Sequence, residues 1–530
     1  MARTLTSLPP EVLHLIIEYF DPKPIGIGAR RPISLHYRRQ CKKREVLGNL
    51  CLASQQLNRI ATSILYRHLT VETAVQCASL FYTLLCTPPL RRYGRSFCCL
   101  ASLGYDDDRE ARHRFDQCLE DNPSSPLQLD ARAKEVLPRV RMSYGDQSGL
   151  VYPSIDRFSE ASVAGISLLL PCLEDILVEL PQFHGDYFMY QIRNLDVWEN
   201  AFGGNEPSWG SALGSLRSLR LQGDPKITDR QSDVRDTGIL PSLVPQIFEA
   251  PNLKQIEFHG DRGDLRSFRS DEDNRGFDLA ERKVSIRGQV EELGLYHSQA
   301  HPSMVYQLLK CFTNLKSLSW TFRQEAWRPI AGVTDYSMDE ALEQTSKSLR
   351  RLRLECLTVS CVYDYYWDPD LIIHFELFDT VKRLSNFPNI ENLTIDLMSL
   401  AGPYHLQHIR NPVFDLSAAL PPNLVRLELI EKSLDDIYVQ YGIEYRRHDE
   451  WLGCVLQSFA KACVTEKPRL REFVFRGFKY SRIRERSRPH IAFLSKCFKQ
   501  AGVDFFWQWE PADRVSSQTG DGVDDSHWYI

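Results

Sequence analysis

The sequence predicts a mixed α/β chain, with a short helical segment at the N-terminus and a long array of short strands and helices after it. Two patterns lead to this fold class: a densely apolar helical pattern within the first 70 residues, and one short apolar phrase that occurs ten times beyond about residue 165. A chain of 530 residues is also too long for one ordinary compact domain. We therefore expect several domains or an array of repeats.

The first predicted helix is capped by Thr6 or Ser7 and carries two prolines and Glu11 in its first turn. Proline is tolerated there, and an acidic side chain suits the positive end of a helix. Residues 12–20 are then apolar around most of the helix. Such a helix must be covered on more than one side. Either its own domain covers it, or part of it is reserved for a partner.

A second apolar helix is predicted at about residues 47–65, where apolar side chains recur at spacings of three and four. Together the two helices form a unit too small to bury all their apolar surface. This favours a partner protein as the cover.

The residues of both helices resemble a known motif. Residues 8–20 read Leu-Pro-Pro-Glu-Val-Leu-His-Leu-Ile-Ile-Glu-Tyr-Phe, which resembles the first helix of an F-box, and residues 47–58 resemble its second half. Residues 60–69 are similar to the segment that follows the motif in many fungal F-box proteins. Two features depart from the family pattern: residues 22–46 separate the halves, and Leu57 stands where a tryptophan is common.

The resemblance implies that the chain docks onto the Skp-family adaptor of a cullin–RING ubiquitin ligase. The chain would then be a substrate-receptor subunit that holds a target protein and performs no catalysis itself. The alternative is a protein-interaction scaffold outside any ligase, whose N-terminal helices cap the repeat array. The predicted adaptor contacts are Leu8, Pro9, Val12, Ile16, Ile17, Leu50 and Leu52.

The segment between the motif halves, residues 22–46, carries eight basic residues and almost no acidic ones. Blocks of like charge repel each other and stay solvated, so the composition predicts a loop. A nuclear-localisation signal or a site for an anionic partner is the alternative.

A connector is predicted between the motif and the repeats, over residues 71–165. It contains a helix at Leu80–Leu85, a strand at Arg95–Leu100 and a charged, partly helical stretch at 106–147. The predicted domains are an F-box-like motif at 1–70, the connector at 71–165, a solenoid at 166–510 and a flexible acidic tail at 511–530.

The repeated phrase is apolar-x-x-apolar-x-apolar. Its last two apolar positions point to the same face of a strand, so each phrase predicts a short strand with one buried face. Charged residues between them, such as Glu257, Arg353 and Glu428, are expected to face water. The ten phrases are Leu173/Ile176/Val178, Ile192/Leu195/Val197, Leu216/Leu219/Leu221, Leu253/Ile256/Phe258, Val290/Leu293/Leu295, Leu315/Leu318/Trp320, Leu349/Leu352/Leu354, Ile390/Leu393/Ile395, Leu424/Leu427/Leu429 and Leu470/Phe473/Phe475.

Several phrases follow a Pro-Asn pair, and helical patterns at 304–312, 379–384 and 452–464 lie between phrases. This strand–turn–helix order resembles a leucine-rich-repeat solenoid. The phrases start 19 to 46 residues apart, and the asparagine usual after the last leucine is nearly absent. The sequence thus predicts an α/β fold in which a short N-terminal helical F-box precedes an irregular leucine-rich-repeat solenoid. An ordinary α/β domain with parallel strands is the alternative.

Catalytic and cofactor motifs are missing from the sequence. It contains no HExxH, GxSxG, Walker A or CxxC motif, so we expect neither enzymatic activity nor a bound metal or cofactor. An enzyme whose site is assembled from distant residues is the remaining alternative. Fourteen dispersed cysteines are typical of reduced thiols in the cytoplasm or nucleus.

A net charge of −5 argues against general nucleic-acid binding, and no apolar run is long enough to cross a membrane. The expected partners are thus proteins. Aromatic residues shortly after one repeat strand are the predicted target contacts, although these rings could equally pack beneath an inserted loop. They are Tyr363, Tyr365, Tyr366 and Trp367.

Overall fold

The computed structural model describes part of the chain. The described residues are 8–22, 35–100, 105–120, 129–144, 158–179, 213–222, 250–259, 289–298, 300, 302–322, 336–356, 380–401, 414–431, 445–478 and 483–510.

The chain has a mixed α/β fold and divides into two compact units, whose described parts lie within residues 8–258 and 259–510. Every strand pair with a defined register is parallel. Helices therefore carry the chain from one strand to the next wherever the connection is described. Among the described helices, none is both long and apolar enough to span a membrane.

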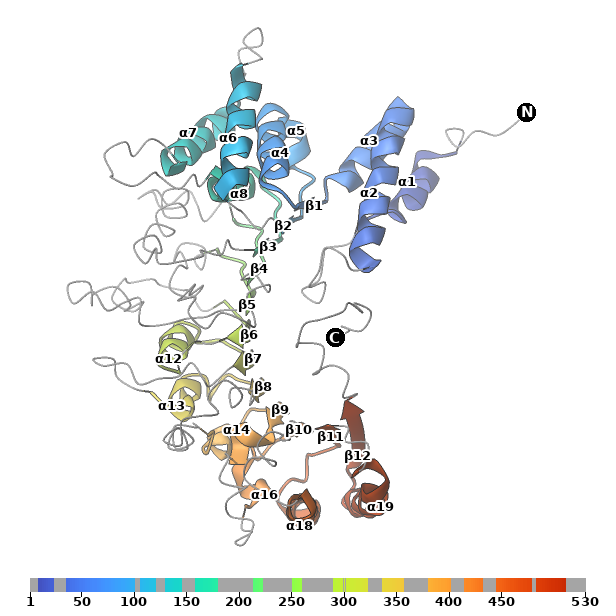
Figure 1. Cartoon of the computed structure of the whole chain (residues 1–530), viewed down its shortest axis with the longest axis vertical. Helices are drawn as coiled ribbons and strands as arrows, with labels where there is room; N and C mark the ends of the chain where they lie inside the picture. The colour runs from blue at the N-terminus through green and yellow to red at the C-terminus, as the bar shows by residue number, and fades with distance from the viewer. Residues whose placement is uncertain are drawn as a thin grey trace, which may run out of the picture. The chain divides into compact units, whose positions relative to one another are not determined.

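In the first unit the strands β1 to β5 are ordered as in the chain. Helices α4 to α8 lie on one side of this sheet and α1 to α3 on the other (Figure 1). The elements are α1 (Pro10–Glu18), α2 (Leu35–Ala53), α3 (Gln55–Leu65), β1 (His68–Val71), α4 (Ala74–Cys86), α5 (Pro88–Arg91), β2 (Ser96–Cys99), α6 (Tyr105–Glu120), α7 (Ala131–Tyr144), α8 (Phe158–Leu169), β3 (Asp175–Glu179), β4 (Ser218–Gln222) and β5 (Gln255–His259).

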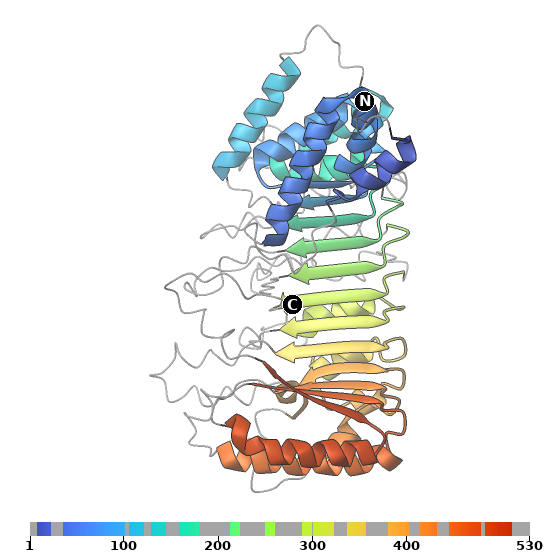
Figure 2. The ribbon, with the colours of Figure 1, turned by 90° about the vertical axis from the view of Figure 1, so that its right-hand side faces the viewer.

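In the second unit the strands β6 to β12 also follow the order of the chain. Figure 2 shows them side by side, with α18 and α19 packed together beyond the last strands. The elements are β6 (Glu292–Ser298), α12 (Pro302–Lys310), β7 (Ser317–Phe322), α13 (Met338–Glu343), β8 (Arg351–Cys356), η8 (Leu384–Asn386), β9 (Asn392–Asp396), α14 (Leu397–Ala401), α16 (Leu416–Ala419), β10 (Arg426–Ile430), α18 (Tyr445–Thr465), β11 (Glu472–Phe478), α19 (Ile483–Gln500) and β12 (Asp504–Glu510).

Nine of the ten phrases form strands, which confirms the prediction, and the phrase at 192–197 lies outside the described residues. The strands align phrase on phrase: Leu318 pairs with Leu352, Leu352 with Leu393, and Leu393 with Leu427. All three apolar positions of each of the nine phrases are buried. The common register stacks identical positions beside one another, which builds a continuous apolar layer under the helices.

The Pro-Asn pairs have a structural role at the start of the strands. Asn389 Nδ2 donates to the carbonyl of Lys347 at 2.7 Å, and Asn423 Nδ2 donates to the carbonyl of Pro388 at 2.8 Å. Asn252 makes the equivalent bond to the carbonyl of Gly214. Each side chain thus satisfies a backbone carbonyl in the turn of the previous strand. In these three repeats the asparagine lies in the turn before the strand, whereas a leucine-rich repeat usually has its asparagine after the strand.

The charged residues between the apolar positions are not simply exposed to water, contrary to the prediction. Glu257 and Glu428 are each only 8% exposed. Glu428 forms an ion pair with Arg476 on the next strand at 2.9 Å, and Arg353 forms one with Glu355 at 2.7 Å. Long side chains on strands about 4.8 Å apart lie across one another, so they shield each other from solvent.

The N-terminal region differs from the prediction in two places. Residues 35–46, expected to be a solvated loop, form the first part of the helix α2. The single helix expected at 47–65 is two helices, because Ser54 ends one and caps the next. Residues 23–34 lie outside the described part, as does the tail from 511.

Other predicted elements had mixed outcomes. The helix expected at 80–85, the strand at 95–100 and the helices at 304–312 and 452–464 are present as α4, β2, α12 and α18. The helix expected at 379–384 is wrong: residues 380–383 are not helical, and a short 3-10 turn begins at Leu384.

Candidate protein-docking site

The first helix, α1, has two apolar faces that point in different directions. Leu13 and Ile17, four residues apart, are buried. On the other face Val12 and Ile16 are each 39% exposed, Leu15 is 68% exposed and Tyr19 is 77% exposed. These four side chains have the spacing i, i+3, i+4, i+7, which places them along one stripe of the helix. We call Val12, Leu15, Ile16 and Tyr19 the α1 stripe.

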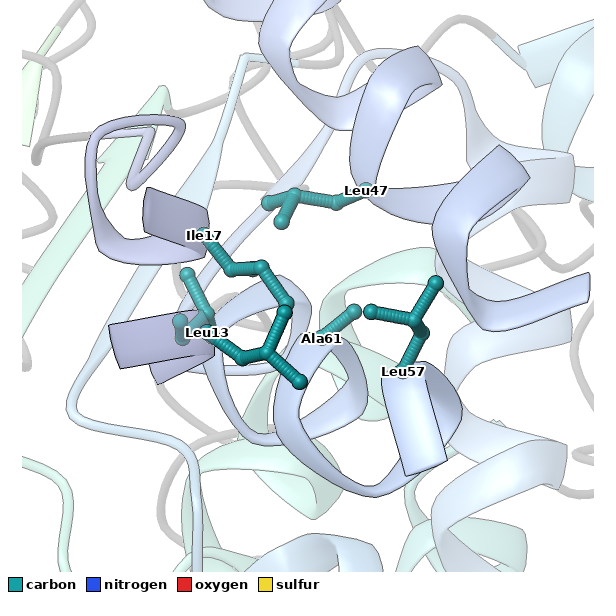
Figure 3. Close-up of a cluster of buried hydrophobic side chains, with 6 residues drawn as sticks. Leu13, Ile17, Leu47, Leu57 and Ala61 are labelled. Atoms are coloured by element: carbon teal, nitrogen blue, oxygen red, sulfur yellow. The ribbon is translucent and has the colours of Figure 1, made fainter. Parts of the chain in front are cut away.

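The inward face of α1 builds a small core with α2 and α3 (Figure 3). Leu13 and Ile17 pack with Leu47 of α2 and with Leu57 and Ala61 of α3. Leu8 and Leu50 pack at the edge of this core. The three helices therefore have a common core. This core holds α1 in place through its buried face, so the α1 stripe is not needed for packing among these helices. We refer to α1, α2 and α3 as the helical module.

Local hydrogen bonds set the directions of α2 and α3. The backbone N–H of Leu57 donates to Ser54 Oγ at 3.2 Å, which caps the first turn of α3. Asn58 Nδ2 donates to the carbonyl of Cys51 at 2.8 Å, near the end of α2. A backbone N–H at the start of α3 and a backbone carbonyl near the end of α2 therefore each have a side-chain hydrogen-bond partner.

A polar group ties the end of α1 to the first strands. Arg67 Nη1 lies 2.7 Å from Asp21 Oδ2 and 3.4 Å from Glu18 Oε1. His68 Nε2 lies 3.7 Å from Asp21 Oδ1, and His68 Nδ1 lies 2.7 Å from Ser96 Oγ. The group runs from the end of α1 through β1 to β2, so the stripe is oriented relative to the sheet.

Serine, histidine and aspartate are also the residue types of a nucleophilic triad. Here Ser96 is only 6% exposed, and the 3.7 Å between Asp21 and His68 is longer than a hydrogen bond. A nucleophile must reach its substrate, and Ser96 is covered. This arrangement suits a structural tie.

The partly buried imidazole of His68 predicts a pH dependence. Burial lowers the pKa of His68, as do the nearby Arg67 and Arg44, whereas Asp21 and Glu174 act in the opposite direction. A histidine whose pKa is lowered by folding binds more protons when unfolded, so its contribution to stability is present above about pH 6.5 and is lost as the pH falls through the folded pKa.

We therefore expect the first unit to be less stable at pH 5.5 than at pH 7.5, as measured by amide hydrogen exchange in β1 and β2. The variant His68→Gln should lose most of this difference, while His14→Gln on α1 should keep it. An unchanged pH dependence in His68→Gln would rule out the imidazole as its source.

The second helix is held against the same sheet. Arg44 of α2 donates to the carbonyl of His68 at 3.0 Å and to Thr70 Oγ1. Lys43 donates to the carbonyl of Asp21 at 3.1 Å and lies 5.8 Å from the ring centroid of Tyr19. Lys43 and Arg44 belong to the segment predicted to be a loop, and both bind groups within the first unit.

The structure divides the predicted adaptor contacts into two groups. Pro9, Val12, Ile16 and Leu52 are exposed, and Leu52 reaches 86%. Ile17 is 1% exposed and lies in the core of the module, while Leu8 and Leu50 are partly buried there. The prediction also missed members of the stripe.

Leu15 and Tyr19 are the missed members, and both are more exposed than Val12 or Ile16. The spacing from Val12 to Tyr19 marks one helical face, but Leu13, Ile16, Ile17 and Phe20 have the same spacing, so the sequence alone does not identify the exposed face. The predicted target contacts at Tyr363, Tyr365, Tyr366 and Trp367 lie outside the described residues.

No cluster of three metal-ligating side chains occurs among the residues whose placement is described. None of the cysteines in the described ranges forms a disulfide. A scan against models of known protein families finds no match, and a search of curated proteins finds no significant match either.

Proposed function

We propose that the chain is a substrate-receptor subunit of a Skp–cullin–F-box ubiquitin ligase, in which the helical module binds the Skp-family adaptor. The observation that carries the proposal is the α1 stripe, an exposed apolar face on a helix whose opposite face has its own core. An F-box is a short helical motif that must offer apolar side chains to a partner, and the sequence of α1 resembles its first helix.

The contact is proposed to use the stripe together with Pro9 at the start of α1 and Leu52 of α2. Burying one large aliphatic side chain contributes roughly 1.5–3 kcal/mol before the costs of association. The four stripe residues offer enough apolar surface to drive binding. Glu11 and Glu18 flank the stripe and are exposed, which would confine the contact to the correct orientation.

The parallel strands and their helices are proposed to form an irregular leucine-rich-repeat solenoid that holds the target protein. The alignment of identical phrase positions in neighbouring strands and the asparagine bonds between successive turns support this reading. Tyr363, Tyr365, Tyr366 and Trp367 remain the proposed target contacts. The chain would act in the cytoplasm or nucleus, and the chemistry would belong to other subunits.

A second candidate function is a scaffold outside any ligase, in which the helical module only caps the array. The bonds from Arg44 to β1 and from Arg67 to Asp21 favour it, because they hold the module against the first strands. A cap needs an inward core but no exposed apolar stripe, since terminal repeats present a polar outer face. The stripe therefore favours docking.

The experiment is a binding titration of the full chain with a purified Skp-family adaptor. We expect micromolar or tighter affinity, and a loss of about 100-fold in the double variant Leu15→Asp/Ile16→Asp, because two apolar contacts worth roughly 3 kcal/mol together are replaced by charges. Hydrogen exchange in α3 should stay unchanged, since both side chains face outward.

The matched control is Val464→Asp, which changes an aliphatic residue of α18 that is 61% exposed in the second unit. Its adaptor affinity should equal that of the unmodified chain. No binding by the unmodified chain, or equal binding by the double variant, would leave the scaffold as the better function.

A further inference from the structure

Two cysteines from different elements belong to one small apolar cluster where α2 packs on the sheet of the first unit. Cys98 of β2 and Leu177 of β3 are each 6% exposed, and Cys41 of α2 packs against them together with Leu100. Cys41 itself is only half-buried. Cys98 is thus buried and Cys41 is partly exposed, although the two residues are 57 positions apart in the sequence.

Arg44 lies close enough to both cysteines to interact with them electrostatically. It follows Cys41 by one turn of α2, and it donates to the carbonyl of His68 and to Thr70 Oγ1. Thr70 is the register partner of Cys98 in the β1–β2 pair. Burial lowers the pKa of Arg44, while Cys41 and Cys98 both act in the opposite direction. The two cysteines thus lie close enough to Arg44 to influence its charge.

We propose that Cys41 and Cys98 are an oxidative-modification site, which hydrogen peroxide closes into a disulfide joining α2 to β2. The Cys41 thiolate attacks a peroxide oxygen, the O–O bond breaks, and the released hydroxide takes up a proton to become water. Cys98 then attacks the sulfenic sulfur of Cys41, the S–O bond breaks, and a second water leaves. Two thiols and one peroxide give one disulfide and two waters.

The order of the two steps follows from burial. Peroxide reaches Cys41 first because its side chain is partly exposed, and the sheltered Cys98 completes the bond from within the cluster. In a reducing compartment such a bond is transient, which suits a signal.

Closure would connect the helical module covalently to the sheet. The helix that carries Cys41 continues to Leu47, which lies in the core of the module. A bond across 57 residues also restricts the unfolded chain. The value of this link for adaptor docking rests on the proposed function, whereas the formation of the bond does not.

The test uses the full chain, reduced and then treated with stoichiometric hydrogen peroxide, alkylated and digested without reductant. Mass spectrometry should find a peptide that joins Cys41 to Cys98 and that dithiothreitol removes. Cys41→Ser and Cys98→Ser should lose this peptide, while Cys86→Ser, at an exposed cysteine of α4, should keep it. Over-oxidation of Cys41 without the linked peptide, or equal linkage of Cys41 to Cys86, would overturn the proposal.

A second measurement is hydrogen exchange of the α2 amides in the oxidised chain without any adaptor present. We expect exchange to slow at least tenfold on oxidation and to be unchanged by peroxide in Cys41→Ser. Unchanged exchange of the α2 amides in the disulfide-linked chain would refute the proposal that the bond holds α2 against the sheet. Neither readout involves the adaptor, so the outcome is separate from that of the Leu15→Asp/Ile16→Asp titration.

Discussion

Replacing Phe473 with alanine is expected to destabilise the second unit by about 3–5 kcal/mol, the usual cost of deleting a buried aromatic side chain. Phe473 lies in β11 and is fully buried. Its ring centroid is 5.0 Å from that of Phe498 in α19, 5.3 Å from that of Phe505 in β12 and 5.7 Å from that of Phe459 in α18. It is therefore the shared contact of two helices and the last strand.

The measurement is amide hydrogen exchange in β10 to β12, where protection should fall by about 10²- to 10⁴-fold if the unit opens as a whole. The control is Phe493→Ala in α19, which removes a ring that is 49% exposed and should change protection little. Equal losses in the two variants would mean that the aromatic cluster does not hold these elements together.

Most strands were predictable because their apolar spacing is a local property. In β4, for example, Leu219 and Leu221 are two residues apart and Leu216 precedes them by three, so the phrase alone marks the strand. The two terminal strands, β1 and β12, were not predicted. Before β12, Gly502 occupies the first apolar position of the phrase.

Gly502 is required by the backbone conformation at the end of α19. Its φ of 75° lies in the left-handed region, and it ends α19 with a bond from the Val503 N–H to the Phe498 carbonyl at 2.9 Å. The end of α19 requires a glycine at position 502, where the phrase would have an apolar residue. The pattern is interrupted, but the strand after it remains.

The candidate site was only partly predictable. Residues 12–20 are apolar around most of the helix, so the sequence cannot tell which face of α1 turns inward. That choice depends on where α3 packs, which is a long-range property. The structure resolves it by burying Leu13 and Ile17 and exposing Leu15 and Tyr19. In the same way, the charge of residues 35–46 predicted solvation, because the contacts of Arg44 with a distant strand cannot be seen in composition.

Replacing Leu13 with alanine is expected to cost about 2–5 kcal/mol and to unfold the helical module locally. Leu13 is fully buried in a core of only six buried residues, so a single truncation removes a large share of the packing. Hydrogen exchange of the α3 amides should accelerate strongly as a result. Leu15→Ala, two residues along the same helix, removes a mostly exposed side chain and should leave α3 protection unchanged.

Both variants should weaken binding of the adaptor, but for different reasons. Leu15→Ala should weaken binding while the module stays folded, since it removes a proposed contact. Leu13→Ala should weaken binding in proportion to the unfolded fraction, and an excess of adaptor should restore protection in α3, because a ligand that binds only the folded form stabilises it. If Leu13→Ala instead left α3 protected and Leu15→Ala unfolded it, the inward and outward faces of α1 would be reversed, and the docking surface would have to be sought on the Leu13 side.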